Sequence, residues 1–171
     1  QTKFDPAFPT VNSPNPENAE AFKHGIALAK KTGAVAVIAT DPDCDRMGVA
    51  VNSKQKGNYT LLNGNEIGAL LAEYRISKLK EFGCIPEMGT KRATIIKTFV
   101  TSPLIEAIAK RHGLNCVNTL TGFKWTGQKI DKYEKELKRE LMEAEGISLN
   151  YDETDYFTRL ELGLKYSNAL I

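Results

Sequence analysis

The sequence has few of the residues that build small metal or disulfide sites. Among its 171 residues there are only three cysteines and two histidines. Cys44, Cys84 and Cys116 lie far apart and form no Cys-x-x-Cys pair, so the sequence supports neither a zinc site nor a disulfide framework. We therefore expect reduced thiols, as in a cytoplasmic protein.

Long apolar runs and basic clusters are also missing. No apolar stretch approaches the roughly 20 residues that span a membrane, and the N-terminus has no signal-peptide pattern. The 23 lysines and arginines are balanced by 21 aspartates and glutamates and are spread along the chain, so we expect no nucleic-acid or membrane partner. What remains is a globular composition with 42% hydrophobic residues, and a length that suits one domain or two small ones.

The first half of the sequence predicts alternating helices and strands. Asn15, Pro16 and Glu17 are typical of a helix start, because an N-cap side chain, an early proline and an acidic first turn each favour one. Apolar residues at helical spacing continue to about Lys31, and Gly33 marks the end. We then expect a buried strand, a return strand, a short strand and a helix, at residues 34–40, 47–53, 58–64 and 66–79.

The second half repeats this alternation after a segment rich in Gly and Pro at residues 81–92, which we interpret as a linker. The expected elements are strand, helix, strand and two further helices, at residues 93–99, 101–113, 114–120, 128–144 and 154–165. The sequence thus predicts the α/β class, with two α/β/α-type units at residues 1–82 and 83–171 and mainly parallel sheets. In such sheets ligands gather at the carboxyl ends of the strands, where the loops 41–46 and 121–127 lie.

Three aspartates at alternate positions, Asp41, Asp43 and Asp45, follow the first expected strand. At this spacing their side chains point to one side, and three converging carboxylates repel one another unless a cation neutralises them. Oxygen-only ligands suit Mg²⁺, and the neighbouring Arg46 can hold a phosphate beside the metal. A solvated turn is the alternative. An EF-hand is excluded, because its sixth and twelfth positions would be Arg46 and Asn52 rather than Gly and Glu.

These residues also carry a family resemblance. The segment "TDPDCDRMGVAV" at residues 40–51 closely resembles the metal-binding loop of the α-D-phosphohexomutases, the phosphoglucomutase and phosphomannomutase family. Further segments, in family order and covering most of residues 8–130, resemble parts of that family's second and third domains: "FPTVNSPNPENAEAF", "LLNGNEIGALLAEY", "GTKRATIIKTFVTSPLI" and "NTLTGFKWTGQKI".

The resemblance implies roles for individual residues. It implies that the three aspartates hold Mg²⁺ and that Arg46 lies beside the transferring phosphate. Lys97 is implied as a second catalytic residue, in proton transfer or phosphate contact. The substrate-binding residues implied for the sugar-facing loop and for the third-domain strand are Thr121, Gly122, Lys124, Trp125, Lys91 and Arg92. For Trp125, packing into the core as an anchor of its loop is an equally weighted alternative to contact with the sugar. We expect Phe123 to lie in the core and Cys44 to be a small packing residue.

The reaction that the resemblance implies interconverts hexose 1-phosphate and hexose 6-phosphate through a phosphoserine, a hexose bisphosphate and Mg²⁺. The family's Ser-His-Asn-Pro and Gly-Glu-Glu-Ser motifs are absent from this sequence, and the chain begins with Gln1. We therefore expect an interior fragment of a longer enzyme, inactive alone, that works with the enzyme's remaining domains. The alternative is a non-catalytic module that binds Mg²⁺ or sugar phosphate.

The resemblance also implies that the first unit is an incomplete domain, and an incomplete sheet exposes an edge that favours self-association. After about Ile130 the family pattern fades into a divergent helical tail. The acids Asp152, Glu153 and Asp155 in this tail are compatible with a second metal site, but a helix start is the favoured interpretation, because acidic residues are stabilising there.

Overall fold

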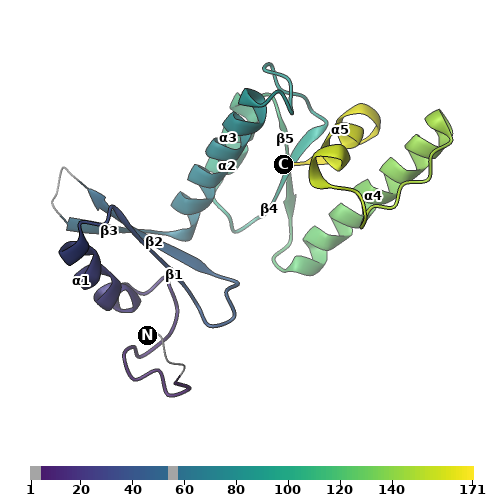
Figure 1. Cartoon of the computed structure of the whole chain (residues 1–171). Coiled ribbons are helices and arrows are strands. Elements are labelled where there is room, and N and C mark those ends of the chain that lie inside the picture. The colour runs from purple at the N-terminus through teal and green to yellow at the C-terminus, as the bar shows by residue number, and fades with distance from the viewer. Residues whose placement is uncertain (1–4, 54–57) are drawn as a thin grey trace. The chain divides into compact units, whose positions relative to one another are not determined.

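The computed structural model describes residues 5–53 and 58–171 (Figure 1). The chain forms two compact units, Gln1–Gly68 and Ala69–Ile171, and each contains a three-stranded sheet. The α/β class predicted from the sequence is confirmed. No helix within the described ranges is both long and apolar enough to cross a membrane.

The sheet of the first unit contains β1 (Ala36–Thr40), β2 (Met47–Ser53) and β3 (Asn58–Leu62), and both strand pairs are antiparallel. This differs from the mainly parallel sheet that the sequence predicts. A parallel pair needs a crossover of about a dozen residues or more, whereas only residues 41–46 separate β1 from β2. So short a connection makes a hairpin, and the interpretation of residues 47–53 as a return strand is confirmed.

A 3₁₀ helix, η1 (Ala19–Phe22), and α1 (Lys23–Thr32) lie against β1. The helix begins later than predicted, because the Asn15 side chain accepts a hydrogen bond of 2.9 Å from the Glu17 N–H and holds this segment in a turn. Gly33 ends α1 as predicted, with a φ of 72° in the left-handed region that favours glycine.

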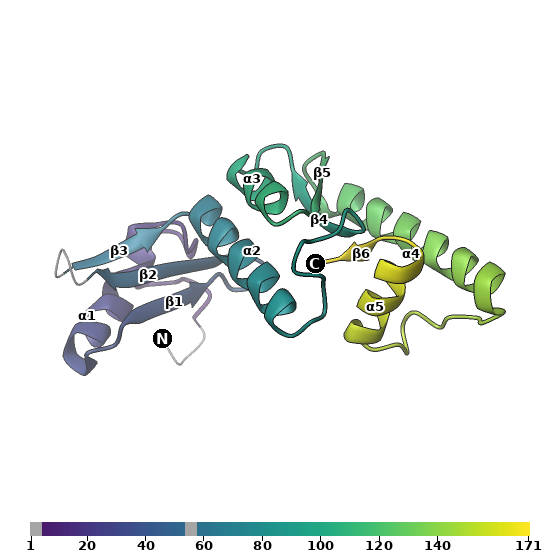
Figure 2. The ribbon, with the colours of Figure 1, turned by 90° about the horizontal axis from the view of Figure 1, so that it is seen from above.

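The second unit is built on a parallel sheet with the strand order β5-β4-β6 (Figure 2). Its strands are β4 (Ala93–Thr98), β5 (Asn115–Thr119) and β6 (Ala169–Leu170). The helices are α2 (Gly64–Glu81), whose first residues belong to the first unit, α3 (Leu104–Arg111), α4 (Phe123–Glu145) and α5 (Tyr156–Tyr166). Here the parallel pairing predicted from the sequence is confirmed.

The core of the second unit draws side chains from both sides of the Gly- and Pro-rich segment. Ile76 of α2 packs in one cluster with Ile85 of that segment, Ala93 of β4, Leu160 of α5 and Ala169 of β6. The boundary between the two compact units falls within the sequence of α2, between Gly68 and Ala69. The sequence-based division between residues 82 and 83 stays a prediction.

The tail folds onto the sheet of the second unit. The expected helix at 154–165 is present as α5, and the Asp155 side chain caps it by accepting hydrogen bonds from the Phe157 and Thr158 N–H groups. This supports the helix-start interpretation of the tail acids. The strand β6 was not predicted, because two residues make no recognisable pattern.

Candidate functional site

The three aspartates converge in the hairpin turn between β1 and β2. One carboxylate oxygen from each of Asp41, Asp43 and Asp45 lies within 4.8 Å of the other two, and the described residues contain no other acidic, histidine or cysteine group of this kind. Asp41 is buried, with 6% of its surface exposed, whereas Asp43 and Asp45 are exposed. The donor set is all oxygen, and the two exposed side chains have room to adjust, so the cluster fits a hard divalent cation.

A tight turn produces this convergence. The Cys44 N–H donates to the Asp41 carbonyl at 3.1 Å, and Cys44 adopts a φ of 60°, which is rare for a residue other than glycine. The Cys44 side chain is exposed and lies 3.5 Å from the Thr40 hydroxyl, so the expectation of a packing residue is wrong. Its role is to let the backbone reverse between the aspartates.

Arg46 closes the same turn. Its backbone N–H donates to Asp41 Oδ1 at 3.1 Å, and its Nε lies 3.4 Å from Asp41 Oδ2 and 3.7 Å from Asp45 Oδ1. The guanidinium is more than half exposed, so it can turn from these carboxylates toward an incoming phosphate.

The pKa values of the two aspartates that Arg46 contacts are shifted in opposite directions. Burial alone would raise the pKa of Asp41, but hydrogen bonds with the Arg46 N–H and with Asp45, together with the Arg46 charge, hold it below its ordinary value. The pKa of Asp45 is raised, first by the hydrogen bond with Asp41, then by burial and by the charges of Asp43 and Asp41. Asp41 is thus the more acidic member of the pair.

A second group of predicted residues gathers at the carboxyl end of the sheet in the second unit. Lys97 is buried near the end of β4, and its ammonium donates to the carbonyls of Thr98 and Thr101 at 3.4 and 3.1 Å. Across from it, Thr119 at the end of β5 donates its hydroxyl to the Lys97 carbonyl at 3.4 Å. These contacts fix the strand ends from which the loop at residues 120–122 departs.

That loop ends at Gly122, whose φ of 116° turns the chain directly into α4. Lys124 and Trp125 therefore lie in the first turn of the helix, with the Lys124 ammonium 5.3 Å from the centre of the Trp125 ring system. Thr121 and Lys124 are exposed, as is Trp125 at 37%. Phe123 is 87% exposed, so the expectation that it belongs to the core is wrong.

A cavity of about 300 Å³ opens beside Trp125, and its lining includes residues that the sequence analysis missed. Asn118 of β5 contributes a buried side-chain oxygen without a hydrogen-bond partner in the described structure. Thr119 of β5 and Gln128, Lys129 and Lys132 of α4 make up the rest of the polar lining. The available signals were weak: Asn118 lies near a strand's carboxyl end, and Lys129 follows Trp125 at helical i, i+4 spacing.

Lys91 and Arg92 lie at the other end of β4, away from Lys97 and the 120–122 loop. The Lys91 ammonium donates to the Leu114 carbonyl at 3.0 Å. The Arg92 guanidinium donates to the carbonyls of Leu164, at 3.1 Å, and of Lys165. Both side chains bind backbone groups at the end of the sheet, and their role in substrate binding stays a prediction.

Comparisons with known proteins agree over most of the chain. Residues 1–56 match the family model "Phosphoglucomutase/phosphomannomutase, alpha/beta/alpha domain II", and residues 63–141 match "Phosphoglucomutase/phosphomannomutase, alpha/beta/alpha domain III". The chain is 41% identical over 139 residues to the phosphoribomutase of Saccharomyces cerevisiae, in a match that covers 79% of this chain and 22% of the relative. It is 38% identical over 130 residues to the phosphoglucomutase of Staphylococcus aureus, with 76% and 22% covered.

A solved N-acetylglucosamine-phosphate mutase, a member of the alpha-D-phosphohexomutase superfamily in its apo form, is also similar. The match has a TM-score of 0.42 and 17% sequence identity, and it covers 57% of this chain and 21% of that structure. The chain spans about a fifth of the length of the curated relatives described above.

Proposed function

Because the chain belongs to the phosphoglucomutase/phosphomannomutase family, we propose that it is the central portion of a phosphohexomutase that interconverts hexose 1-phosphate and hexose 6-phosphate. The named relatives act as a phosphoribomutase and a phosphoglucomutase, so glucose 1-phosphate and ribose 1-phosphate are the first substrates to compare. The phosphoserine that carries the phosphoryl group would come from the enzyme's remaining domains, because this sequence has no Ser-His-Asn-Pro motif.

The observation that carries this proposal is the convergence of three carboxylates within 4.8 Å beside a partly exposed arginine. Asp41, Asp43 and Asp45 would hold Mg²⁺, and a bound Mg²⁺ would lower the charge repulsion around a phosphoryl group. Arg46 positions that phosphoryl group by presenting its guanidinium to two phosphate oxygens at once.

The second unit contributes groups suited to the sugar phosphate. Lys124 offers an exposed ammonium to a phosphate, and Trp125 beside it offers an aromatic face to a sugar ring. Among the described residues, the buried Lys97 ammonium donates to carbonyls, so a phosphate or a sugar hydroxyl reaching it would meet a desolvated cation. The side-chain oxygen of Asn118 in the adjoining cavity, which has no hydrogen-bond partner in the described structure, can accept a hydrogen bond from a sugar hydroxyl.

Calorimetric titration with Mg²⁺ tests the metal site. Asp43→Asn is the informative variant, because Asp43 is exposed and its replacement leaves the hydrogen bonds of Asp41 in place. We expect this variant to bind Mg²⁺ about tenfold more weakly or worse than the wild type, since one of the oxygen ligands loses its charge. Asp131→Asn, an exposed aspartate on α4 that pairs with Lys135, is the matched control. Equal Mg²⁺ affinity of all three proteins would refute the site.

A coupled assay with glucose 1-phosphate tests the fragment claim separately. We expect no sustained turnover from this chain alone, and turnover would overturn the need for the remaining domains. The second candidate function, a non-catalytic module, is favoured by the fact that the aspartate cluster and the cavity at Trp125 both exist within this chain. Binding of glucose 1,6-bisphosphate without turnover in any longer form of the protein would support it.

A further inference from the structure

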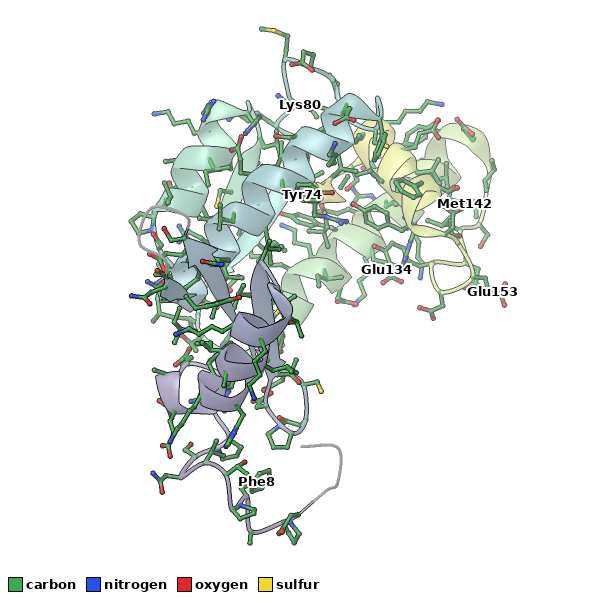
Figure 3. The ribbon with its side chains drawn as sticks, turned by 60° about the vertical axis from the view of Figure 1, so that its left-hand side comes forward. Phe8, Tyr74, Lys80, Glu134, Met142 and Glu153 are labelled. Atoms are coloured by element: carbon green, nitrogen blue, oxygen red, sulfur yellow. The ribbon has the colours of Figure 1, made fainter. Side chains whose placement is uncertain are left out.

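A second cavity, of about 200 Å³, lies in the divergent tail. Its walls come from α4, from the segment that approaches α5, from α5 itself and from β6, and they include Tyr133, Leu137, Tyr151, Tyr156, Arg159 and Asn168. Figure 3 labels this region at Glu134 and Met142 on α4 and at Glu153 on the approach to α5. None of the residues assigned to metal or sugar phosphate lines this cavity.

Arg159 is the charged residue of this cavity, and its donors are incompletely used. Its Nε is fully buried and has no hydrogen-bond partner among the described residues. The guanidinium lies 4.6 Å from the centre of the Tyr151 ring, which covers it without accepting a hydrogen bond from it. Buried donors without a partner are rare in proteins, so the Arg159 side chain would gain a hydrogen bond by turning toward an acceptor in the cavity that it lines.

The shape of the donor group and the lining together select the acceptor. The Nε–H and a neighbouring terminal N–H of a guanidinium point the same way and match the two oxygens of a carboxylate. The rest of the lining is largely aromatic and aliphatic, with Leu137 and Leu160 among the tyrosines, so it fits an apolar ligand body. A phosphate ion has no apolar body to contact this part of the lining.

Two further features favour a small anion. The hydroxyls of Tyr133 and Tyr151 form no hydrogen bond within the described part of the chain and can donate to a ligand. The Arg75 guanidinium lies 5.0 Å from the centre of the Tyr156 ring and adds positive potential from α2. The volume is below the roughly 300–1,000 Å³ of sites for drug-sized molecules, which limits the ligand to metabolite size. We propose that this cavity binds a small carboxylate with an aromatic or apolar body.

Benzoate is the probe, and backbone amide NMR of the whole 171-residue chain is the measurement. We expect benzoate to shift the signals of Tyr133, Tyr151, Arg159 and Asn168, and benzamide, its neutral isostere, to leave them unchanged. No shifts at these residues with benzoate, or equal shifts with benzamide, would overturn the proposal. Inorganic phosphate shifting the same signals at the same concentration would refute selection for an apolar body.

Arg159→Gln tests the residue that carries the inference. We expect benzoate to bind it about tenfold more weakly or worse, because the charge-assisted hydrogen bonds are lost. Arg139→Gln is the matched control, since it makes the same charge change at an exposed arginine of α4 and should bind like the wild type. Unchanged benzoate affinity in a folded Arg159→Gln protein would refute the site. If that variant fails to fold, the comparison of benzoate with benzamide on the wild type decides.

Discussion

Gly48 supports the aspartate turn from the first residues of β2. A Cβ atom at this position would overlap the carbonyl oxygen of Pro16 and would lie 2.9 Å from the ring of Phe22, which is buried. The chain between Pro16 and Phe22 thus packs directly on the backbone that leaves the turn. At this position glycine gives close packing, and a larger residue would push the supporting segment away.

We predict that Gly48→Ala destabilises the first unit by about 1–3 kcal/mol, because backbone atoms have to move to admit the methyl group. Thermal unfolding followed by circular dichroism measures the change, and Mg²⁺ affinity should fall with it. Gly127→Ala in α4 is the control, since nothing lies within 4 Å of the added methyl group and alanine favours a helix. A Gly48→Ala protein as stable as the Gly127→Ala protein would show that the packing is looser than described.

The spacing of three aspartates was enough to predict a cluster, because side chains at alternate positions share a side whether the segment is extended or tightly turned. The hydrogen bond from the Arg46 N–H to Asp41 depends on the left-handed backbone at Cys44, which the sequence pattern did not predict. Asn118 could not be predicted as a cavity residue, because its surroundings come from α4 as well as β5.

The start of α5 is defined by a charged cap. Asp155 accepts hydrogen bonds from the Thr158 hydroxyl at 2.6 Å and from the N–H groups of Phe157 and Thr158 at 2.9 and 3.1 Å. Hydrogen bonds from the Thr158 side chain and backbone are the main reason that the pKa of Asp155 is lowered. The folded protein therefore favours the ionised carboxylate, and this contribution to stability is present above the pKa of an unfolded aspartate.

We predict that Asp155→Ala lowers the Tm by a few degrees near neutral pH. The difference from the wild type should shrink as the pH falls through the lowered pKa of Asp155, because the protonated wild-type side chain loses the same interactions. Thermal unfolding at neutral and acidic pH measures it, with Asp152→Ala as an exposed control. A Tm difference that is independent of pH would mean that the carboxylate charge plays no part in capping.

The sequence predicted least well those elements whose position depends on pairing with residues far away in the sequence or on the backbone angle of a single glycine. The start of α4 was expected near Gln128, after a loop at residues 121–127, but the helix begins at Phe123 once Gly122 has turned the chain. β6 exists because Ala169 and Leu170 pair with the first residues of β4. Because the paired residues lie far apart in the sequence, the residues around β6 form no local pattern that predicts a strand.

At the scale of the whole molecule, the first unit presents an uncovered apolar surface. On one face of its sheet Ile38 pairs with Val49, and Val49 pairs with Leu62, so an apolar row crosses all three strands. Ile38 is 67% exposed, and β1 is an edge strand. Exposed apolar rows beside an open edge promote association between copies of a chain.

We predict that the wild-type chain self-associates with rising concentration and that Ile38→Lys reduces this association, because a charge interrupts the apolar row. Sedimentation velocity over a concentration series measures it. Leu28→Lys, which makes the same change at an exposed position on α1, should associate like the wild type. Equal sedimentation of all three proteins at every concentration would exclude the sheet face as the surface of contact.

The proportions of α4 and β4 have a consequence for how this fold tolerates changes in length. At about 1.5 Å per residue, the 23 residues of α4 extend about 35 Å, whereas the six residues of β4 span about 20 Å. The chain leaves the sheet after β5 and returns to it as β6, and only those two ends are fixed by strand pairing. Residues added at the exposed positions 146–148, between α4 and Tyr151, would lengthen this excursion without moving a strand, so this is where an inserted tag or peptide should do least harm.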